Sequence, residues 1–211
     1  MCDFSIKRGA IMKITTIILD IGNVLVSFCW KKHLHNLGFS GELFSRIANA
    51  TVLSPQWDEF DKGVLSEEQL LELFIQNDPD IEIEIRRMYE NINNMIEVYD
   101  YTESWIKDLK RQGFHVYILS NFSSKQYRES YEKLSFLHLT DGAVLSFQEK
   151  MIKPDNRIYQ LLLNRYHLKA DECVFIDDKP ANIEGAILNG IHGLLFTTYE
   201  NTLKALKNYS L

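Results

Sequence analysis

The sequence predicts an α/β fold, namely a doubly wound, Rossmann-like parallel sheet with a small helical cap subdomain inserted into it. Short apolar runs rich in Ile, Val and Phe indicate buried parallel strands, because helices cover both faces of such a sheet. Amphipathic segments alternate with these runs, which is the rhythm of βαβ units. About 95 residues separate the first apolar run from the second. This is far more than one crossover helix requires, so an insertion is expected there.

The predicted strands are Ile14–Leu19, Phe114–Leu119, Cys173–Ile176 and Ile191–Phe196, with a weaker fifth candidate at Ala143–Phe147. The helices predicted between and after them are Glu103–Gln112, Lys125–Leu134, Asn156–His167, Asn182–Asn189 and Thr202–Asn208. Pro154 suits the first turn of a helix, so the third of these helices is expected to begin near it.

The insertion between the first two strands reads as helical. Helices are predicted at Trp30–Leu37, Glu42–Ala50, Ser66–Gln76 and Ile81–Glu97. Ser66 and Gln69 form a capping-box pattern at the start of the third. Trp57, Asp58 and Glu59 are expected to form a loop that faces the substrate. The predicted division is a core of residues 12–28 and 99–211 and a cap of residues 29–98.

The charge balance argues against a nucleic-acid or membrane partner. The 211 residues carry a formal net charge of −6, and the pI is near 5.5. Nucleic acids and anionic membranes instead attract clustered Lys and Arg. No apolar run approaches the roughly 20 residues that a membrane-spanning helix needs. A small molecule or another protein is therefore the expected partner, and the oligomeric state is left open.

The cysteines and the N-terminus favour a cytoplasmic protein. Cys2, Cys29 and Cys173 form no metal-binding spacing, and their odd number argues against a closed disulfide framework, so free thiols in a reducing compartment are expected. The start of the chain lacks the small-residue cleavage site of a signal peptide. Met12 directly precedes the first predicted strand, so residues 1–11 are expected to be either a dispensable extension or the result of a mis-assigned start.

Polar residues follow three of the four clear strands. Asp20 comes after the first, Ser120–Asn121 after the second and Asp177–Asp178 after the third. The carboxyl ends of parallel strands form the ligand crevice of an open α/β sheet, so these side chains are expected at one rim. Lys153, just before a predicted helix, is a fourth contributor.

These residue types together indicate phosphoryl transfer. Three carboxylates at one rim would repel one another unless a cation compensates. Mg²⁺ is suited to this, because it prefers oxygen ligands and commonly combines one or two carboxylates with substrate phosphate oxygens. Lys153, Ser120 and Asn121 would then bind the phosphate, and Asp20 would be free to attack phosphorus as a carboxylate nucleophile.

The four segments resemble the motifs of the haloacid dehalogenase superfamily of phosphohydrolases, in that family's order and spacing, across nearly all of residues 14–197. The matching segments are Asp20-Ile21-Gly22-Asn23-Val24, Leu119-Ser120-Asn121, Lys153 in I-K-P-D, and Phe175-Ile176-Asp177-Asp178. The resemblance implies that Asp20 is the nucleophile and a ligand of Mg²⁺. The Gly22 backbone carbonyl and Asp178 would be further ligands, and Asp177 would support the metal through water. It also implies that Ser120, Asn121 and Lys153 bind the phosphate of a small phosphorylated metabolite.

The inserted segment W-D-E-F-D-K-G-V-L-S-E-E resembles the cap pattern of one branch of this superfamily. That branch includes the bacterial alpha-D-glucose-1-phosphate phosphatase and the N-terminal phosphatase domain of epoxide hydrolases.

Gly22 departs from the superfamily pattern. Most of its phosphatases have a second Asp there, which protonates the leaving group and then deprotonates the hydrolytic water. Such acid–base help is typically worth about 10² to 10⁴ in rate. The branch just named includes members with D-x-G-N. An anomeric oxygen leaves more readily than an ordinary alcohol, so Gly22 favours a sugar 1-phosphate as substrate. Slow hydrolysis of the aspartyl-phosphate is also expected.

Other interpretations stay open. The loss of the acid at position 22 also fits a degenerate member that binds a phosphorylated ligand or a protein partner without turnover. A metal-independent haloacid dehalogenase would use the same Asp20 nucleophile, although the acid pair Asp177–Asp178 speaks against it. The same acid pair and Ser120–Asn121 are also common types of helix N-cap, and a single Lys153 is more often a solvated surface charge.

Overall fold

The structure is a computed structural model that describes residues 14–207. The expectations for residues 1–11, for Cys2 and for the end of the last helix lie outside these residues. Cys29 and Cys173 are free thiols, as predicted.

A five-stranded parallel sheet forms the centre of the core and confirms the predicted fold class. Its strands are β1 (Thr16–Leu19), β4 (His115–Ser120), β5 (Gly142–Leu145), β6 (Cys173–Asp177) and β7 (His192–Leu195). Their spatial order is β5-β4-β1-β6-β7. All four pairings are parallel, with Ile17 of β1 opposite Val116 of β4 and Val174 of β6. The first strand therefore lies in the middle, where the strand order reverses and a ligand crevice is expected.

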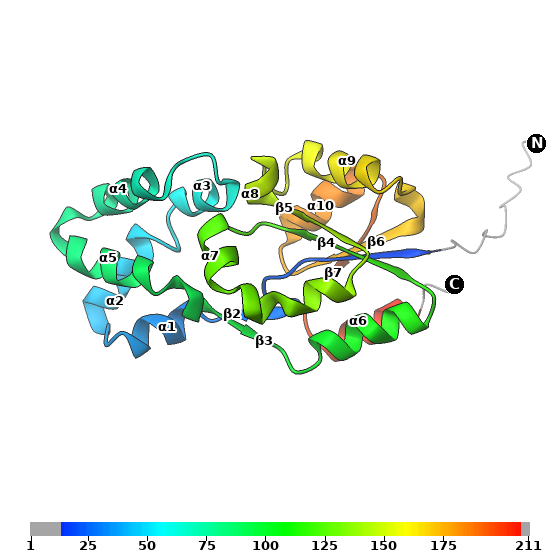
Figure 1. The fold of residues 1–211 in the computed structure, drawn as a ribbon, viewed down its shortest axis with the longest axis horizontal. Helices are drawn as coiled ribbons and strands as arrows, with labels where there is room; N and C mark the ends of the chain where they lie inside the picture. Colours follow the sequence, from blue (N-terminus) through cyan, green and yellow to red (C-terminus); the bar gives the residue numbers. More distant parts are fainter. Residues whose placement is uncertain (1–13, 208–211) are drawn as a thin grey trace, which may run out of the picture.

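Alternate residues of the central strand pack into two separate hydrophobic layers. Ile17 and Leu19 join one buried cluster, and Ile18 joins the other. This alternation follows from the two-residue period of a strand. Trp105 of α6 (Thr102–Arg111) and Leu206 of α11 (Tyr199–Leu206) belong to the first cluster. The second contains residues of α9 (Asn156–Arg165) and α10 (Pro180–Leu188), which cover the opposite face of the sheet (Figure 1).

Two features of the core helices differ from the prediction. Helix α9 begins at Asn156, as its predicted bounds have it, but Pro154 precedes the helix instead of occupying its first turn, because Asp155 is its N-cap and accepts a hydrogen bond from the Arg157 backbone N–H. The segment predicted as one helix at Lys125–Leu134 is divided into α7 (Ser124–Glu129) and the 3₁₀ segment η3 (Tyr131–Leu139). The remaining short elements of the core are α8 (Ser146–Glu149) and η4 (Ala170–Glu172).

The insertion folds into a helical cap. Its elements are α1 (Trp30–Asn36), α2 (Gly41–Ala50), α3 (Gln56–Lys62), α4 (Glu67–Asn77), η1 (Pro79–Ile81), α5 (Glu82–Glu90) and η2 (Ile92–Met95). The capping box of Ser66 and Gln69 is present at the start of α4, as predicted. Helix α3 replaces the predicted substrate-facing loop. It is followed by Gly63 with a φ of 66°, a left-handed conformation that glycine adopts readily.

Two short strands connect the cap to the core. β2 (Val26–Phe28) and β3 (Ile96–Val98) pair as an antiparallel ribbon, with Phe28 opposite Ile96. The last predicted cap helix, Ile81–Glu97, is wrong in its second half, because η2 and β3 occupy that part. The ribbon lies close to the predicted division at residues 28/29 and 98/99, and that division into domains stays a prediction.

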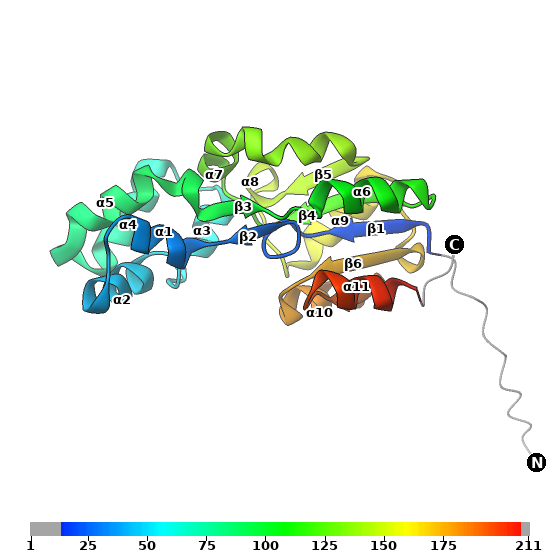
Figure 2. The same cartoon turned by 90° about the horizontal axis from the view of Figure 1, so that it is seen from below.

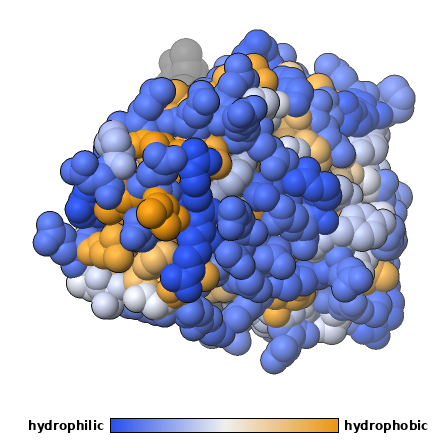
Figure 3. Space-filling model, turned by 60° about the vertical axis from the view of Figure 1, so that its left-hand side comes forward, coloured by the Kyte–Doolittle hydropathy of each residue, from blue (hydrophilic) through white to orange (hydrophobic). Residues whose placement is uncertain are grey.

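The cap lies beyond the end of the sheet at which β1 terminates, as the two ribbon views show (Figures 1 and 2). It has its own buried cluster, which includes Phe60, Phe74 and Tyr89. Figure 3, which turns the cap side of the molecule forward, shows hydrophobic side chains gathered among hydrophilic ones on this face. Among the helices of residues 14–207, none combines the length and the apolar character that crossing a membrane requires.

Candidate active site

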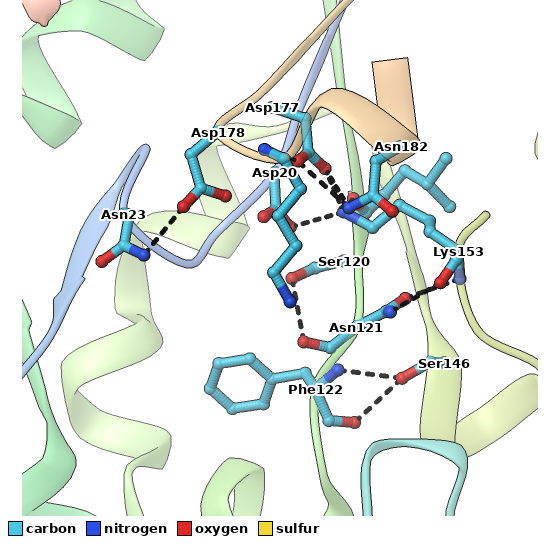
Figure 4. Close-up of polar contacts among 12 residues, drawn as sticks. Asp20, Asn23, Ser120, Asn121, Phe122, Ser146, Lys153, Asp177, Asp178 and Asn182 are labelled. Carbon is cyan, nitrogen blue, oxygen red and sulfur yellow. Dashed lines mark hydrogen bonds and ion pairs between the residues drawn. The ribbon is translucent and has the colours of Figure 1, made fainter. Parts of the chain in front are cut away.

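The polar residues predicted at the strand ends meet at one rim of the sheet (Figure 4). Asp20 follows β1, Ser120 ends β4, and Asp177 ends β6. Lys153 lies in the segment between α8 and α9 and reaches the same place. The structure therefore brings side chains from distant parts of the sequence into direct contact under the cap.

Lys153 is a buried cation held between two carboxylates. Its side chain is 1% exposed, and its Nζ lies 2.8 Å from Asp20 Oδ1 and 2.6 Å from Asp177 Oδ2. It also donates a hydrogen bond of 2.9 Å to the Leu119 carbonyl. Burial alone would lower the pKa of this ammonium group, but the two ion pairs outweigh burial and raise it. Lys153 is therefore charged, and it is not the solvated surface lysine of the alternative interpretation.

Asp20 combines burial with a neighbouring positive charge. Burial raises the pKa of its carboxyl group to about 6, and the charge of Asp177 adds to this effect. Lys153 and a hydrogen bond from Ser120 lower the pKa and so favour the ionised form. One oxygen, Oδ1, is directed toward Lys153, which leaves Oδ2 as the oxygen available for other contacts.

Asp177 and Asp178 have different surroundings although they are adjacent. Asp177 is fully buried and accepts hydrogen bonds from the Lys179 backbone N–H at 2.7 Å and from Asn182 Nδ2 at 2.9 and 3.1 Å. Asp178 is half-buried and accepts one from Asn23 Nδ2 at 2.9 Å. Asp177 thus fixes the start of α10 and the position of Lys153, whereas Asp178 is turned toward the cavity. Carboxylate oxygens of Asp20, Asp177 and Asp178 lie within 4.8 Å of one another, a spacing that can hold a metal ion.

A tight turn after β1 places Gly22 and Asn23 beside these carboxylates. The backbone N–H groups of Val24, Leu25 and Val26 all donate to the Ile21 carbonyl. Asn23 has a φ of 57°, a conformation that asparagine tolerates better than most residues. Its side chain accepts from the Phe28 backbone N–H at 3.1 Å and donates to Asp178. Asn23 therefore orients Asp178, a role that the sequence analysis did not assign.

Ser120 and Asn121 do not act as helix caps in the structure. Ser123 caps α7 instead, by accepting from the Gln126 backbone N–H. Ser120 is fully buried beneath the site. The Asn121 side chain accepts from the Lys153 backbone N–H at 2.8 Å and donates to the Lys153 carbonyl at 3.1 Å. Both residues thus hold neighbouring groups of the site in position.

A cavity of about 240 Å³ lies between these residues and the cap. This is below the roughly 300 Å³ at which common ligand pockets begin, so the cavity suits a small ligand or the phosphate-bearing end of a larger one. The polar residues in its lining are Asp20, Asn23, Asp61, Asn121, Gln126, Lys153, Asp178, Lys179 and Asn182. The apolar ones are Val26, Phe28, Trp30, Val52, Leu53, Trp57, Ile96 and Phe122, and Gly22 completes the lining.

No role was predicted for five of these polar residues, which are Asn23, Asp61, Gln126, Lys179 and Asn182. Asp61 and Trp57 both line it from α3, whereas Asp58 is exposed and outside it. Gln126 is 4% exposed, and its Nε2 has no acceptor among residues 14–207. Asn182 lies five residues after Asp177. For Asp61 a signal was available, because residues four apart share one face of a helix.

A sequence profile described as haloacid dehalogenase-like hydrolase matches residues 43–196, more than half of the chain. A sesquiterpene phosphatase of Aspergillus oryzae is 26% identical over 183 residues, which cover 85% of this chain and 88% of the relative. The chloroplast flavin mononucleotide hydrolase 1 of Arabidopsis thaliana is 25% identical over 155 residues. These cover 74% of this chain and 62% of that relative, so the chain spans less than two thirds of its length.

Solved structures share the same architecture. An enzyme of the haloacid dehalogenase family from Bacteroides thetaiotaomicron, solved with magnesium and inorganic phosphate, superimposes with a TM-score of 0.69. The alignment covers 90% of this chain and 98% of that one at 18% identity. A dehalogenase with an intermediate complex gives a TM-score of 0.71 at 16% identity, with 90% and 88% covered. The profile match, together with this shared fold, means that the chain belongs to the haloacid dehalogenase-like hydrolases.

Proposed function

We propose that this hydrolase is a Mg²⁺-dependent phosphatase that cleaves a small phosphate monoester through an aspartyl-phosphate on Asp20. One observation carries the proposal: Asp20, Lys153 and Asp178 line a single cavity, and Asp177 lies directly behind Lys153. This arrangement provides a nucleophile, an anion-binding cation and metal ligands at one point. The phosphatases among its relatives support the same reaction class.

The residues present fit a magnesium ion. Asp20, Gly22 and Asp178 line the cavity, so two carboxylates and one backbone carbonyl are available as the oxygen donors that Mg²⁺ prefers. Asp177 does not line the cavity, and its oxygens already accept hydrogen bonds, which suits a supporting role through water. When bound, the metal would supply positive charge that offsets the repulsion among the carboxylates and the phosphate oxygens.

The protein groups suit an in-line displacement at phosphorus. Lys153 holds Asp20 through one oxygen, so the other can face the phosphorus atom of a bound ester. The Lys153 charge and backbone N–H groups after β4 would bind the equatorial phosphate oxygens, with Ser120 and Asn121 holding this framework. Asn23 would keep Asp178 in position for the metal, as supporting residues commonly do in metal sites.

The apolar part of the cavity bears on the alcohol portion of the substrate. Phe28, Trp30, Trp57 and Phe122 are among its lining residues. This lining favours an ester with an apolar or aromatic group, and the phosphatases of a flavin mononucleotide and of a sesquiterpene are consistent with it. That the substrate is a sugar 1-phosphate stays a prediction from Gly22. Membership of the glucose-1-phosphatase branch stays a prediction from the cap pattern, and a cytoplasmic location stays a prediction too.

A substrate screen tests the proposed reaction. We expect phosphate release with Mg²⁺ from at least one of flavin mononucleotide, farnesyl phosphate, glucose 1-phosphate and 4-nitrophenyl phosphate. EDTA should abolish the release and added Mg²⁺ should restore it, because the clustered carboxylates need a cation. Halide release from 2-chloropropionate in EDTA would instead favour a dehalogenase. Tight ligand binding without phosphate release would favour the non-catalytic interpretation.

Leu53 offers a test of the apolar lining. It is 59% exposed and lines the cavity, whereas Val64, also in the cap, is 58% exposed and does not. We expect Leu53→Ser to raise KM for farnesyl phosphate about fivefold, because a partial leucine contact is worth about 1 kcal/mol. The matched variant Val64→Ser should leave KM unchanged. Equal KM values for the two variants would argue against an apolar substrate group at this wall.

A further inference from the structure

Asp61 is an acidic side chain that the cap contributes to the cavity above Asp20. It lies near the C-terminal end of α3 and lines the same cavity as Asp20 and Gly22. Trp57, four residues earlier, lines it too, so one face of α3 is directed at the site. The carboxyl group of Asp61 has no hydrogen-bond donor within the part of the chain from Ile14 to Lys207, which leaves it available to a ligand.

The core holds this part of α3 in place through backbone contacts. Ser146, the first residue of α8, donates a hydrogen bond of 2.6 Å to the Asp61 carbonyl. Lys150 donates to the Gly63 carbonyl. A Cβ at Gly63 would lie only 3.0 Å from the Phe147 Cβ, which shows how closely α3 approaches α8 here. The position of Asp61 relative to the core is therefore fixed by contacts that do not involve its own carboxyl group.

The surroundings of Asp61 suit proton exchange near neutral pH. Burial raises the pKa of its carboxyl group to about 7. Lys179 and Lys153 lower this pKa, while Asp58 and Asp20 raise it. A general acid or base is most effective when its pKa lies near the working pH. This raised pKa supports a role in proton transfer for a carboxyl group that geometry alone has placed in the cavity.

Position 22 has room for a Cβ atom but carries no side chain. A Cβ added to Gly22 would have Asp20 Oδ2 as its nearest neighbour, at 3.9 Å. We propose that Asp61, from the cap, carries out the two proton transfers that Gly22 cannot. This inference rests on the proposed phosphatase function and assigns a second catalytic residue to the same site.

The two steps balance in atoms and charge. First, Asp20 forms a bond to phosphorus, the bond from phosphorus to the ester oxygen breaks, and the protonated Asp61 gives its proton to that oxygen. An alcohol and an Asp61 carboxylate result. In the second step this carboxylate takes a proton from water, whose oxygen attacks phosphorus as the bond to Asp20 breaks. Hydrogen phosphate leaves, Asp20 is again a carboxylate, and Asp61 is again protonated.

Esters that differ in leaving group test this role. 2-Phenylethyl phosphate has a poor leaving group that needs a proton, whereas 4-nitrophenyl phosphate has a good one. We expect Asp61→Asn to lower kcat/KM for the first ester about 10²-fold or more, and for the second less than tenfold. The comparison uses kcat/KM because this constant covers only the steps up to and including cleavage of the ester. The ratio of the two constants is independent of the folded fraction of the variant.

Two further variants complete the experiment. Asp80→Asn makes the same chemical change at an exposed position of the cap that does not line the cavity and should change either constant only about twofold. The double variant with Gly22→Asp and Asp61→Asn should have a kcat/KM for 2-phenylethyl phosphate at least about tenfold above that of Asp61→Asn alone. Equal losses on both esters, no loss on either, or no recovery with Gly22→Asp would overturn the inference. If the wild type releases phosphate with Mg²⁺ from neither of these two esters nor any other substrate of the screen, the proposed function itself fails and this inference fails with it.

Discussion

Replacement of Asp20 by Asn is expected to lower kcat for phosphate-ester hydrolysis by about 10³-fold or more, since loss of a nucleophile has cost up to about 10⁶ in other hydrolases. An amide of the same shape cannot form the aspartyl-phosphate. The measurement is steady-state phosphate release, combined with acid-quenched trapping of radiolabelled phosphate on the protein. The wild-type protein should retain radiolabelled phosphate at Asp20, whereas the Asp20→Asn variant should retain none.

The loss of activity in Asp20→Asn should occur without unfolding of the protein. The pKa of Asp20 is raised by burial, so its ionised form costs stability at neutral pH and a neutral amide removes this cost. Lys153 keeps its ion pair with Asp177 in the variant. We therefore expect Tm to be at least that of the wild type. Asp171→Asn, an exposed position in η4 just before β6, is the matched control and should keep full activity. Unchanged turnover in Asp20→Asn would mean that another nucleophile or a contaminating enzyme is responsible.

The sequence predicted the layers of the core well because each strand and helix there carries its own periodic signal. Apolar runs and amphipathic segments identify themselves locally. The ribbon of β2 and β3 was missed for the opposite reason. Each strand has three residues, too few for a pattern, and each pairs with a segment about 70 residues away. Helix α3 was also missed, although Gly63 marks its end.

The candidate site was predictable in its location and less so in its contacts. The rule that ligands bind at the carboxyl ends of parallel strands is enough to gather Asp20, Ser120 and Asp177. It does not reveal that Lys153 is buried between two carboxylates, since that depends on the path of an irregular segment. Asp61 was missed because the preceding residues were assigned to a loop, and its orientation follows only from a helical assignment.

Replacement of Lys153 by Met should destabilise the protein as well as inactivate it. Removing one partner of a buried ion pair typically costs about 3 to 5 kcal/mol, because the other charge stays buried without compensation. Here two carboxylates, those of Asp20 and Asp177, lose their shared cation. Denaturant unfolding in EDTA at pH 7.5 measures the change. Lys107→Met breaks an exposed ion pair with Glu103 and should cost only about 0.3 to 0.5 kcal/mol.

The pH dependence of this loss identifies its cause. Asp20 already has a folded-state pKa of about 6 against an ordinary value of 3.8, and the loss of Lys153 should raise it further. A carboxyl group with a raised folded-state pKa costs stability above that pKa, and the cost falls as the pH drops and the group is protonated. The difference between Lys153→Met and wild type should therefore narrow between pH 7.5 and pH 5. If the difference in unfolding free energy stays constant with pH, the loss of stability is due to packing. If it narrows, the charge of Lys153 is what makes two buried carboxylates tolerable in the absence of metal.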